Sequence, residues 1–401
     1  MVETALKAVI GKPGEPPALS LKERDRRYRQ VRAALAERHI DALIVTGTDL
    51  LYLSGGVSGE EFGLLPTDEN EAFEAVIAWR WLVDVPAQVL IDSQEWVKRV
   101  RSGRNAVVLA ERLSELRLER GTIGYSGPFT YADLIGLKKV HPALTLVDAS
   151  DILANARTIK SAEEIALIDR ANLIFDAAVS RVRETARPGM LGREVVQIGL
   201  QAMWDAGGDL DSSFLLNFGA APVQSPVWAD ITLSQPIKAG DIATLTAHSR
   251  FHHYSGHSDQ EIAIGSPKPR HERMFAAVKQ VRAAVLRRVH PATTMREVFS
   301  LYEAACREAG YTPSAHSQIH QYGINVPEFP GPGFRIPDNE ANRGLGGGGN
   351  YRLSKGMIFS ISPTLIDAES GETLLGGNTL VVSDEGYREL GSRGVELLVA
   401  G

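Results

Sequence analysis

The sequence predicts a two-domain protein, with a smaller α/β domain over residues 1–155 and a larger α+β domain over residues 156–401. Its 401 residues exceed what one ordinary hydrophobic core accommodates. Strand-like and helix-like patterns alternate in the first half, whereas long helical patterns and hairpin-like strands fill the second. With 44% hydrophobic and 23% charged residues, the composition is typical of a globular chain and excludes a disordered one.

The first half predicts a sheet covered by helices. Apolar residues recur at helical spacing from Leu21 to His39, and the run DALIVT at 41–46 follows as a buried strand. Such alternation favours a mixed or parallel sheet. The other expected elements are strands at 74–80, 87–91, 106–110, 121–125 and 144–148, and helices at 93–101 and 131–139.

The second half opens with a long helix. Ser161 followed by Glu164 is a capping-box pattern directly ahead of an apolar periodic run, so we place the domain boundary just before it, near residue 155. The grouping of the elements that follow favours helices packed against a curved antiparallel sheet. These are helices at 192–206, 271–290 and 294–310, and strands at 241–248, 260–264, 357–362 and 379–383.

Charge and composition exclude several classes of protein. With 43 basic and 49 acidic residues the formal charge is −6, so we expect no nucleic-acid partner. The single cysteine, Cys306, excludes an intramolecular disulfide and a multi-cysteine metal site. The N-terminus lacks the basic start and apolar core of a signal peptide, and no apolar run approaches the roughly 18 residues of a membrane span. We therefore expect a cytoplasmic protein without a membrane partner.

Histidine is concentrated in two short windows, which is the strongest chemical signal in the chain. Neutral histidine can act as a general base near pH 7, and a neighbouring carboxylate stabilises its charged form. The second window is a loop rich in Gly and Pro, and His320 with Asp259 or Glu328 is a candidate acid–base pair there. The clustered histidines are His248, His252, His253 and His257, then His316 and His320.

The first window predicts a hairpin. Residues 242–248 form the first strand, residues 249–256 a turn, and the return strand carries Asp259. Thr246 and His248 share one face of the first strand, so Asp259 is expected to converge with them. For His248 and Asp259, a buried hydrogen bond without a catalytic role remains the alternative.

The chain resembles the creatinase, prolidase and aminopeptidase P family over nearly its full length. The N-terminal marker is DALIVTGTDLLYLSGG, and the junction marker is RTIKSAEEIALIDRA. The later blocks follow in the family's order: KAGDIATLTAH, GHSDQEIAIG, HQYGINVPEFPG, LSKGMIFSISPT and GGNTLVVSDEG. The resemblance implies a pita-bread α+β catalytic domain with a smaller α/β N-terminal domain. It also implies a homodimer in which the N-terminal domain closes the partner's pocket.

The resemblance implies that the family's metal centre is lost. Metal-dependent members use two aspartates, a histidine and two glutamates, because hard divalent ions need carboxylates. Three of the five donors are absent here, so we expect neither a metal nor a cofactor. A mononuclear site through His248, His257, Asp259 and His320 remains an alternative. The family's five ligand positions fall on Thr246, Asp259, His320, Ser362 and Gly377.

Creatinase is the metal-free member, and the chain resembles it in length and in the 13-residue step from Thr246 to Asp259. Creatine is nevertheless not the expected substrate. Gln224 stands where creatinase has its proton-shuttling histidine, and Ser362 replaces a glutamate that binds the guanidinium group of creatine. Asp259 stands in for another glutamate, and Arg335 lies near an arginine that holds the substrate carboxylate.

We therefore expect a metal-independent hydrolase that cleaves a C–N bond in a small polar metabolite, with His320 or His248 as the base and Asp259 as its partner. A lyase or isomerase, an inactive binding module and a metal-dependent peptidase remain alternatives. Clustered titratable groups favour an enzyme over a binding module. Further substrate contacts are expected from Thr246, His257, Gln224, Glu328, Arg335 and Ser362, and from the partner's Glu60 and Glu61 unless these two only form an exposed acidic loop.

Overall fold

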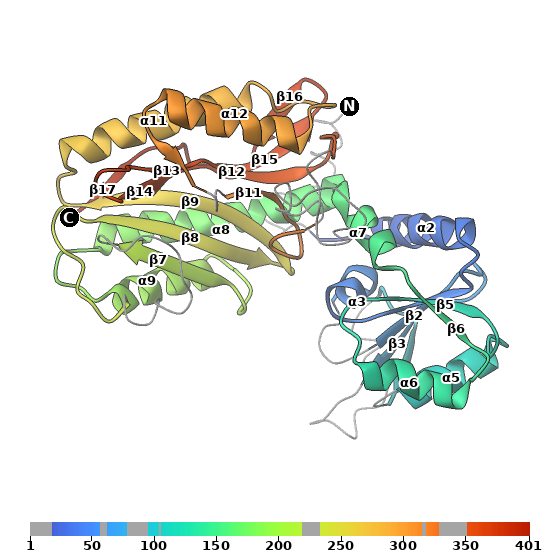
Figure 1. Cartoon of the computed structure of the whole chain (residues 1–401). Helices are drawn as coiled ribbons and strands as arrows, with labels where there is room; N and C mark the ends of the chain where they lie inside the picture. The colour runs from blue at the N-terminus through green and yellow to red at the C-terminus, as the bar shows by residue number, and fades with distance from the viewer. Residues whose placement is uncertain are drawn as a thin grey trace. The chain divides into compact units, whose positions relative to one another are not determined.

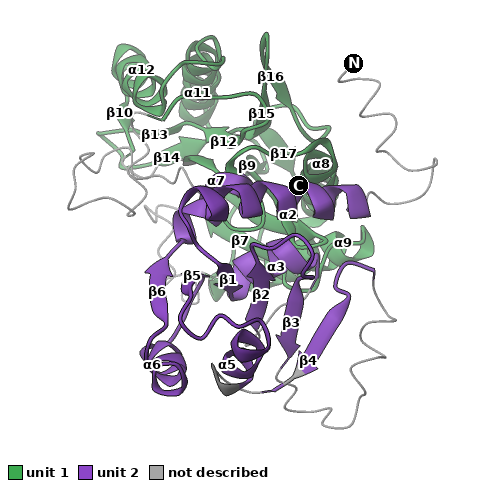
Figure 2. Cartoon of the chain, turned by 90° about the vertical axis from the view of Figure 1, so that its right-hand side faces the viewer, with its two compact units in different colours: residues 1–17, 158–401 green, residues 18–157 purple. Residues whose placement is uncertain are grey.

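The computed structural model describes residues 18–56, 62–77, 95–103, 106–218, 233–314, 318–328 and 351–401. The chain divides into two compact units, shown in different colours in Figure 2. One contains the described residues of 18–157, and the other contains those of 158–401. The division falls at the end of helix α7 (Ser150–Thr158), and the expected boundary near 155 lies within the same helix.

The N-terminal unit is built on a mixed six-stranded sheet in the order β4-β3-β2-β1-β5-β6. The central strand β1 is buried at every residue and pairs in parallel with β5 and antiparallel with β2. The expected strand at 41–46 is this central strand. The strands are β1 (Ala42–Val45), β2 (Phe62–Pro66), β3 (Glu74–Ile77), β4 (Arg99–Ser102), β5 (Thr122–Ser126) and β6 (Thr145–Asp148).

Two expected elements of this unit are wrong. Residues 106–110 belong to helix α5 (Ala106–Glu115), whose buried Leu109 and Leu113 lie one turn apart and give it an apolar face. The expected helix at 93–101 is also wrong, because residues 95–98 are irregular and residues 99–101 belong to strand β4, which pairs in parallel with β3. The expected strand at 87–91 lies outside the described residues. The other helices are α2 (Leu21–Glu37), α3 (Gly47–Ser54) and α6 (Tyr131–Val140).

The C-terminal unit begins with helix α8 (Ala162–Thr185), and both halves of the predicted capping box are present. The Glu164 N–H donates to Ser161 Oγ at 3.2 Å, and the Ser161 N–H donates to Glu164 Oε2 at 2.8 Å. In Figure 1, α8 and α9 lie on one side of the strands, and α11 and α12 lie on the other. The later helices within the described residues include α9 (Gly192–Asp205), α11 (Pro269–Leu286) and α12 (Met295–Glu308).

Three sheets lie between these helices, in the orders β17-β9-β8-β7, β11-β12-β15-β16 and β10-β13-β14. A bridge between Asp259 of β9 and Gly377 links the first sheet to the segment that precedes β15. The strands are β7 (Ser213–Phe218), β8 (Ile242–Phe251), β9 (Tyr254–Ile264), β10 (Thr312–Pro313), β11 (Gln318–Gln321), β12 (Ile358–Ser362), β13 (Thr364–Ile366), β14 (Thr373–Leu375), β15 (Asn378–Ser383), β16 (Gly386–Glu389) and β17 (Leu398–Ala400).

Helices α11 and α12 hold strand β12 in place through an apolar core. Val278 and Val281 of α11 and Phe299 of α12 pack with Phe359 and Ile361 of β12, all nearly inaccessible to solvent. Each such side chain contributes about 1.5–3 kcal/mol when fully buried. This core holds β12, which ends at Ser362, against the two helices. Within the described ranges, no helix has the length and apolarity needed to cross a membrane.

The hairpin of β8 and β9 is longer than expected and turns in only two residues. His252 and His253 both have positive φ, 47° and 67°, as a two-residue hairpin turn of type I′ requires. Their N–H groups donate to the Asp209 carboxylate at 3.1 and 2.7 Å. The expected turn at 249–256 is therefore wrong, because the ladder between the two strands continues to Phe251 and Tyr254.

Candidate active site

One face of the β8–β9 hairpin carries three consecutive cross-strand pairs of polar side chains. Residues two apart on a strand point to the same face, and directly opposed residues on neighbouring strands do so as well. The register therefore gathers six polar residues that are mostly buried. The pairs are His248 with His257, Thr246 with Asp259, and Thr244 with Glu261.

Asp259 lies at the centre of this face and is 1% exposed. Thr246 Oγ1 donates to its Oδ1 at 2.6 Å. Its Oδ2 is buried and has no hydrogen bond of ordinary geometry among the described residues. Burial raises the pKa of Asp259, while the hydroxyls of Ser362 and Thr246 and the two nearby imidazoles of His320 and His248 oppose the rise. The carboxylate is thus held in a site with little compensating charge.

Three imidazoles lie in a row beside this carboxyl group. The ring of His257 is 4.8 Å from that of His248 and 4.9 Å from that of His320, measured between centroids. His320 comes from β11, so the row joins two sheets. Tyr322 contacts the rings of His257 and His320 edge-on, with centroids at 5.8 and 6.3 Å.

Burial lowers the pKa of His320 to about 3, and the neighbouring His257 adds to the shift. Burial also lowers the pKa of His248. Both imidazoles are therefore neutral near pH 7 and can accept a proton. His320 Nδ1 lies 3.4 Å from the Gln321 carbonyl oxygen, so the tautomer that donates from Nδ1 leaves Nε2 as the acceptor.

Glu261 is a buried carboxyl group that sequence reasoning missed. Thr244 Oγ1 donates to Oε2 at 2.7 Å, and the Leu375 N–H donates to Oε1 at 3.0 Å. Burial raises the pKa of Glu261 to about 8, and the negative charge of Asp259 adds to the rise. The sequence did contain a sign of its role. Glu261 follows Asp259 by two residues, and in a strand this spacing places both side chains on one face.

The residues at the family's ligand positions do not fit its dinuclear metal centre. Thr246 and Ser362 offer neutral hydroxyls, and Gly377 has no side chain. A Cβ at position 377 would lie 2.0 Å from the Ile361 carbonyl oxygen and 2.5 Å from Ser362 Oγ, so this backbone leaves no space for a glutamate. Among the described residues no group of three His, Cys, Asp or Glu side chains is arranged to hold a metal ion, and this includes the alternative mononuclear site.

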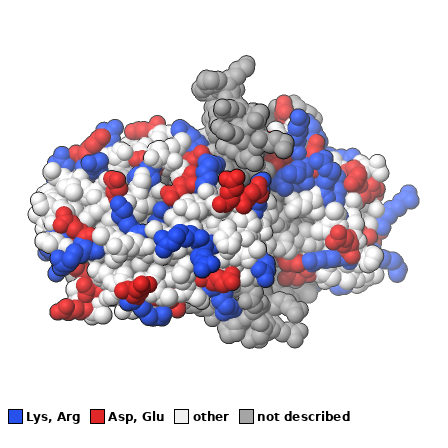
Figure 3. Space-filling model, turned by 90° about the horizontal axis from the view of Figure 1, so that it is seen from above, with Lys and Arg blue, Asp and Glu red and all other residues white. Residues whose placement is uncertain are grey.

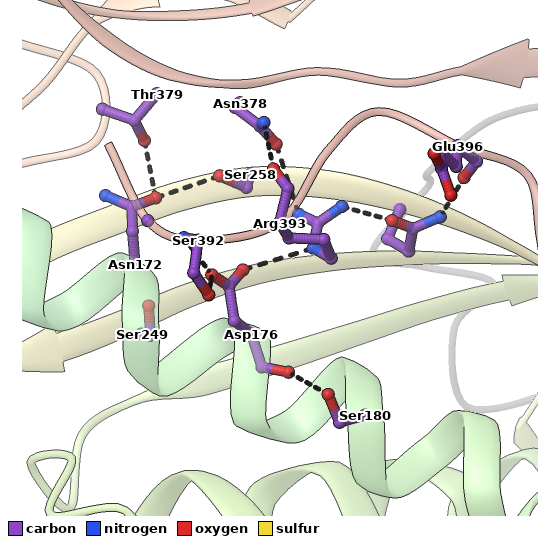
Figure 4. Close-up of polar contacts among 12 residues, drawn as sticks. Asn172, Asp176, Ser180, Ser249, Ser258, Asn378, Thr379, Ser392, Arg393 and Glu396 are labelled. Carbon is purple, nitrogen blue, oxygen red and sulfur yellow. Dashed lines mark hydrogen bonds and ion pairs between the residues drawn. The ribbon is translucent and has the colours of Figure 1, made fainter. Parts of the chain in front are cut away.

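On the opposite face of β9 from Asp259, a network of buried hydrogen bonds connects this strand to helix α8 and strand β15 (Figure 4). Asn172 Oδ1 of α8 accepts from Ser258 Oγ at 3.0 Å and from Thr379 Oγ1 at 2.7 Å. Thr379 Oγ1 also lies 3.0 Å from the His257 carbonyl oxygen, and Tyr322 binds the same hydroxyl. The peptide that carries His257 is thereby held from three elements.

A second part of this network is centred on the half-buried Arg393 (Figure 4). Its guanidinium pairs with Asp176 of α8 at 3.2 Å and donates to the side chain of Gln260 on β9. Gln260 Nε2 in turn donates to the Glu396 carbonyl oxygen at 2.6 Å. Burial lowers the pKa of Arg393, and the negative Asp176 opposes this. The outer face of β9 is thus fixed on both sides of Asp259.

Glu328 is held within the loop that follows β11. Its Oε2 accepts from Lys160 Nζ at 2.9 Å, and its Oε1 accepts from the N–H groups of Ile324 and Asn325 at 3.1 Å each. Both charged side chains are almost fully buried. The remaining predicted site residues lie outside the described residues: Glu60, Glu61, Gln224, His316 and Arg335.

Two family models match this chain. The model of metallopeptidase family M24 matches residues 166–388, and that of the creatinase/prolidase N-terminal domain matches residues 27–159. An Xaa-Pro dipeptidase from Pyrococcus furiosus is 22% identical over 289 residues, which cover 72% of this chain and 78% of that protein. A creatinase from Bacillus sp. (strain B-0618) is 24% identical over 408 residues, which cover 93% and 92%.

Solved structures show the same fold over almost the whole chain. An Xaa-Pro dipeptidase from Bacillus anthracis matches with a TM-score of 0.77 and 19% identity, covering 94% of this chain and 99% of the other. A dipeptidase from Pyrococcus horikoshii OT3 matches with a TM-score of 0.74 and 22% identity, covering 93% and 99%. The predicted pita-bread α+β domain with a smaller α/β N-terminal domain is confirmed.

Proposed function

Because the chain belongs to metallopeptidase family M24 and is a hydrolase of that family, we propose that it works without a metal ion and cleaves a C–N bond in a small polar metabolite. The observation that carries the proposal is a buried carboxyl group beside a row of three imidazoles, at a site where Thr246, Ser362 and Gly377 occupy three of the family's five ligand positions. Titratable groups gathered with perturbed pKa values are typical of catalytic sites.

The donor set supports independence from metal. A divalent ion in such a centre needs several carboxylate ligands to balance its charge. Asp259 is the one carboxylate at the five positions, and its Oδ1 already accepts a hydrogen bond from Thr246 Oγ1. The approach of Ile361 to Gly377 closes the space of a second carboxylate, so a single substitution elsewhere does not rebuild the centre.

The charge balance supports a cationic substrate. The buried Asp259 faces neutral hydroxyls of Thr246 and Ser362 and the neutral imidazole of His320. A buried carboxylate without a positive partner is unfavourable, so a bound amidinium, guanidinium or ammonium group would stabilise its ionised form. Substrates with a C–N bond at such a cationic centre therefore fit this site best.

The chemistry of the residues present supports hydrolysis of this kind. Neutral His320 takes a proton from a water molecule, whose oxygen forms a bond to the carbon of the C–N group. Asp259 stabilises the imidazolium that results. When the C–N bond breaks, the imidazolium returns the proton to the departing nitrogen, so that the amine leaves and His320 is neutral again. Water is consumed, and no other reactant is needed.

A ligand screen followed by an activity assay tests the proposal. We expect amidines or cyclic amino acids to raise the melting temperature in a thermal-shift screen that also contains dipeptides, because a ligand of the native state stabilises it by mass action. Hits are then incubated with the protein, and release of an amine or ammonia is measured with and without a chelator. Elemental analysis of the same sample is expected to find no stoichiometric transition metal.

Three outcomes would contradict this proposal. Stoichiometric Mn, Fe, Co or Zn together with chelator-sensitive cleavage would indicate a metal-dependent peptidase. Binding of a hit without any product would indicate a binding module. Product formed without consumption of water would indicate a lyase or an isomerase in the same pocket.

A further inference from the structure

An open cavity of about 560 Å³ lies beside helix α11, outside the candidate active site. Its size is typical of sites for small molecules. Figure 3 looks onto the face of the molecule that carries α11 and α12, where basic and acidic side chains are interspersed. Within the cavity this balance is broken, because its ionisable lining is mainly basic. The lining contains Lys279, Arg282, Arg287, Tyr387 and Glu389.

The basic residues come from helix α11 and its C-cap. Lys279 and Arg282 are three residues apart on α11, and Arg287 follows at its C-cap. Residues three or four apart are neighbours on a helix surface. Strand β16 supplies Tyr387 and Glu389 to the same cavity, so that three cations and one carboxylate share it.

Glu389 offsets only one of these three positive charges, that of Arg282. Its Oε1 accepts from Arg282 Nη1 at 3.1 Å, and its Oε2 accepts from the Asn378 amide at 3.0 Å. No ion pair of Lys279 or Arg287 occurs within the part of the chain that the structure describes. The cavity therefore has an excess of two positive charges.

Arg282 provides a second, independent observation. The residue is 8% exposed, and its Nε donates to the Ile361 carbonyl oxygen at 3.3 Å. Its Nη2 is buried and has no hydrogen-bond partner among the described residues. A buried charged donor of this kind is rarely left unsatisfied in a native protein. Arg282 thus lines the cavity with its charge partly offset by Glu389, and its unused donor lies beneath the cavity surface.

We propose that this cavity binds a small oxyanion, the phosphate or carboxylate group of a metabolite, at a site separate from the catalytic one. The exposed Lys279 and Arg287 supply charged donors that reach the anion, and Arg282 adds positive charge to the cavity lining. Tyr387 of β16 also lines the cavity. The site does not depend on the reaction proposed above.

Calorimetric titration with inorganic phosphate, pyrophosphate and citrate tests this site, with sodium chloride at matched ionic strength as the reference. We expect saturable binding of at least one of these anions, and their order of affinity identifies phosphate or carboxylate as the preferred group. The double variant K279A/R287A is expected to weaken that binding by about tenfold or more, because two charge-assisted contacts are lost.

The variant K268A/R273A is the matched control. Lys268 and Arg273 lie at the N-cap and in the first turns of the same helix, outside the cavity lining, and their loss changes the net charge equally. We expect this variant and His320→Ala to bind the anion as the unmodified protein does. The proposal is overturned if no anion binds beyond the chloride reference, if K279A/R287A binds normally, or if K268A/R273A loses as much affinity.

Discussion

Thr246 Oγ1 donates a hydrogen bond to Asp259 Oδ1 at 2.6 Å from a directly opposed position on the neighbouring strand. Both residues are 1% exposed, so this contact forms away from solvent. Thr246 occupies the position of the other aspartate ligand that the family's metal-dependent members are expected to have. Asp259 therefore has a hydroxyl group beside it in place of a carboxylate. The contact stabilises the ionised carboxylate without adding a charge. The second oxygen, Oδ2, takes no part in this hydrogen bond.

The first prediction concerns catalysis by His320 and Asp259. We expect His320→Ala or Asp259→Asn to lower kcat by a factor of about 10² to 10⁴, the usual contribution of a general acid or base. The double variant should be little worse than either single one, because both residues serve the same proton transfer. Turnover is measured on the substrate that the screen identifies.

The exposed His290 offers the control for this pair, and His290→Ala should leave turnover unchanged. Melting temperatures of all variants are measured in parallel. Normal turnover with a lowered melting temperature in His320→Ala and Asp259→Asn would show that the two residues only support the fold.

The second prediction concerns Gly377. A Cβ there meets backbone at 2.0 Å, so Gly377→Ala is expected to lower the free energy of unfolding by about 1–3 kcal/mol or more. Gly394→Ala is the control, because no atom lies within 4 Å of its Cβ position. Urea unfolding of both variants compares them directly. Equal stability of the two would mean that position 377 has room for a side chain.

The third prediction is a pH dependence of stability caused by Glu261. Its pKa is about 8 in the native protein, against 4.5 for an unperturbed glutamate, so the native state binds a proton that the unfolded state releases between these values. Stability therefore falls as the pH rises from about 4.5 to 8. Glu261→Gln removes this loss, with an upper limit of roughly 5 kcal/mol at pH 8.

Unfolding free energies of Glu261→Gln and of the unmodified protein at several pH values check this. The gap between the two should widen toward pH 8 in favour of the variant. The exposed Glu308 on α12 is the control residue, and Glu308→Gln should keep the original profile. A constant gap across this range would contradict the assignment of the proton to Glu261.

The fourth prediction concerns Asn172, whose amide oxygen holds the peptide of His257 through Ser258 and Thr379. Asn172→Leu is expected to cost about 1–3 kcal/mol, because two buried hydroxyls lose their acceptor. It should also move the imidazole NMR signals of His257. Ser180→Ala on the same helix is the control, since Ser180 is exposed and its hydroxyl donates to the Asp176 carbonyl oxygen of its own helix. Unchanged histidine signals in Asn172→Leu would show that the network does not position the site.

Some elements could be predicted because their signals are local. Ser161 and Glu164 are three residues apart and form the capping box of α8 in the structure. The alternation of β8 likewise places Thr246 beside Asp259, as the hairpin pattern implied. The apolar run at 106–110 was too short to separate a strand from a helix by its pattern, and the packing of Leu109 and Leu113 in the core made it part of α5.

The sequence by itself determined the family, the two-domain fold, the capped helix α8 and the candidates Asp259, His248 and His320, because motifs and periodicity follow from neighbouring residues. Only the tertiary structure decided that His257 lies between His248 and His320 and that Ile361 closes the space at Gly377. These relationships join strands from different sheets, and distances between such strands depend on how the helices pack against them. Burial, which shifts the pKa values of Asp259 and His320, has the same origin.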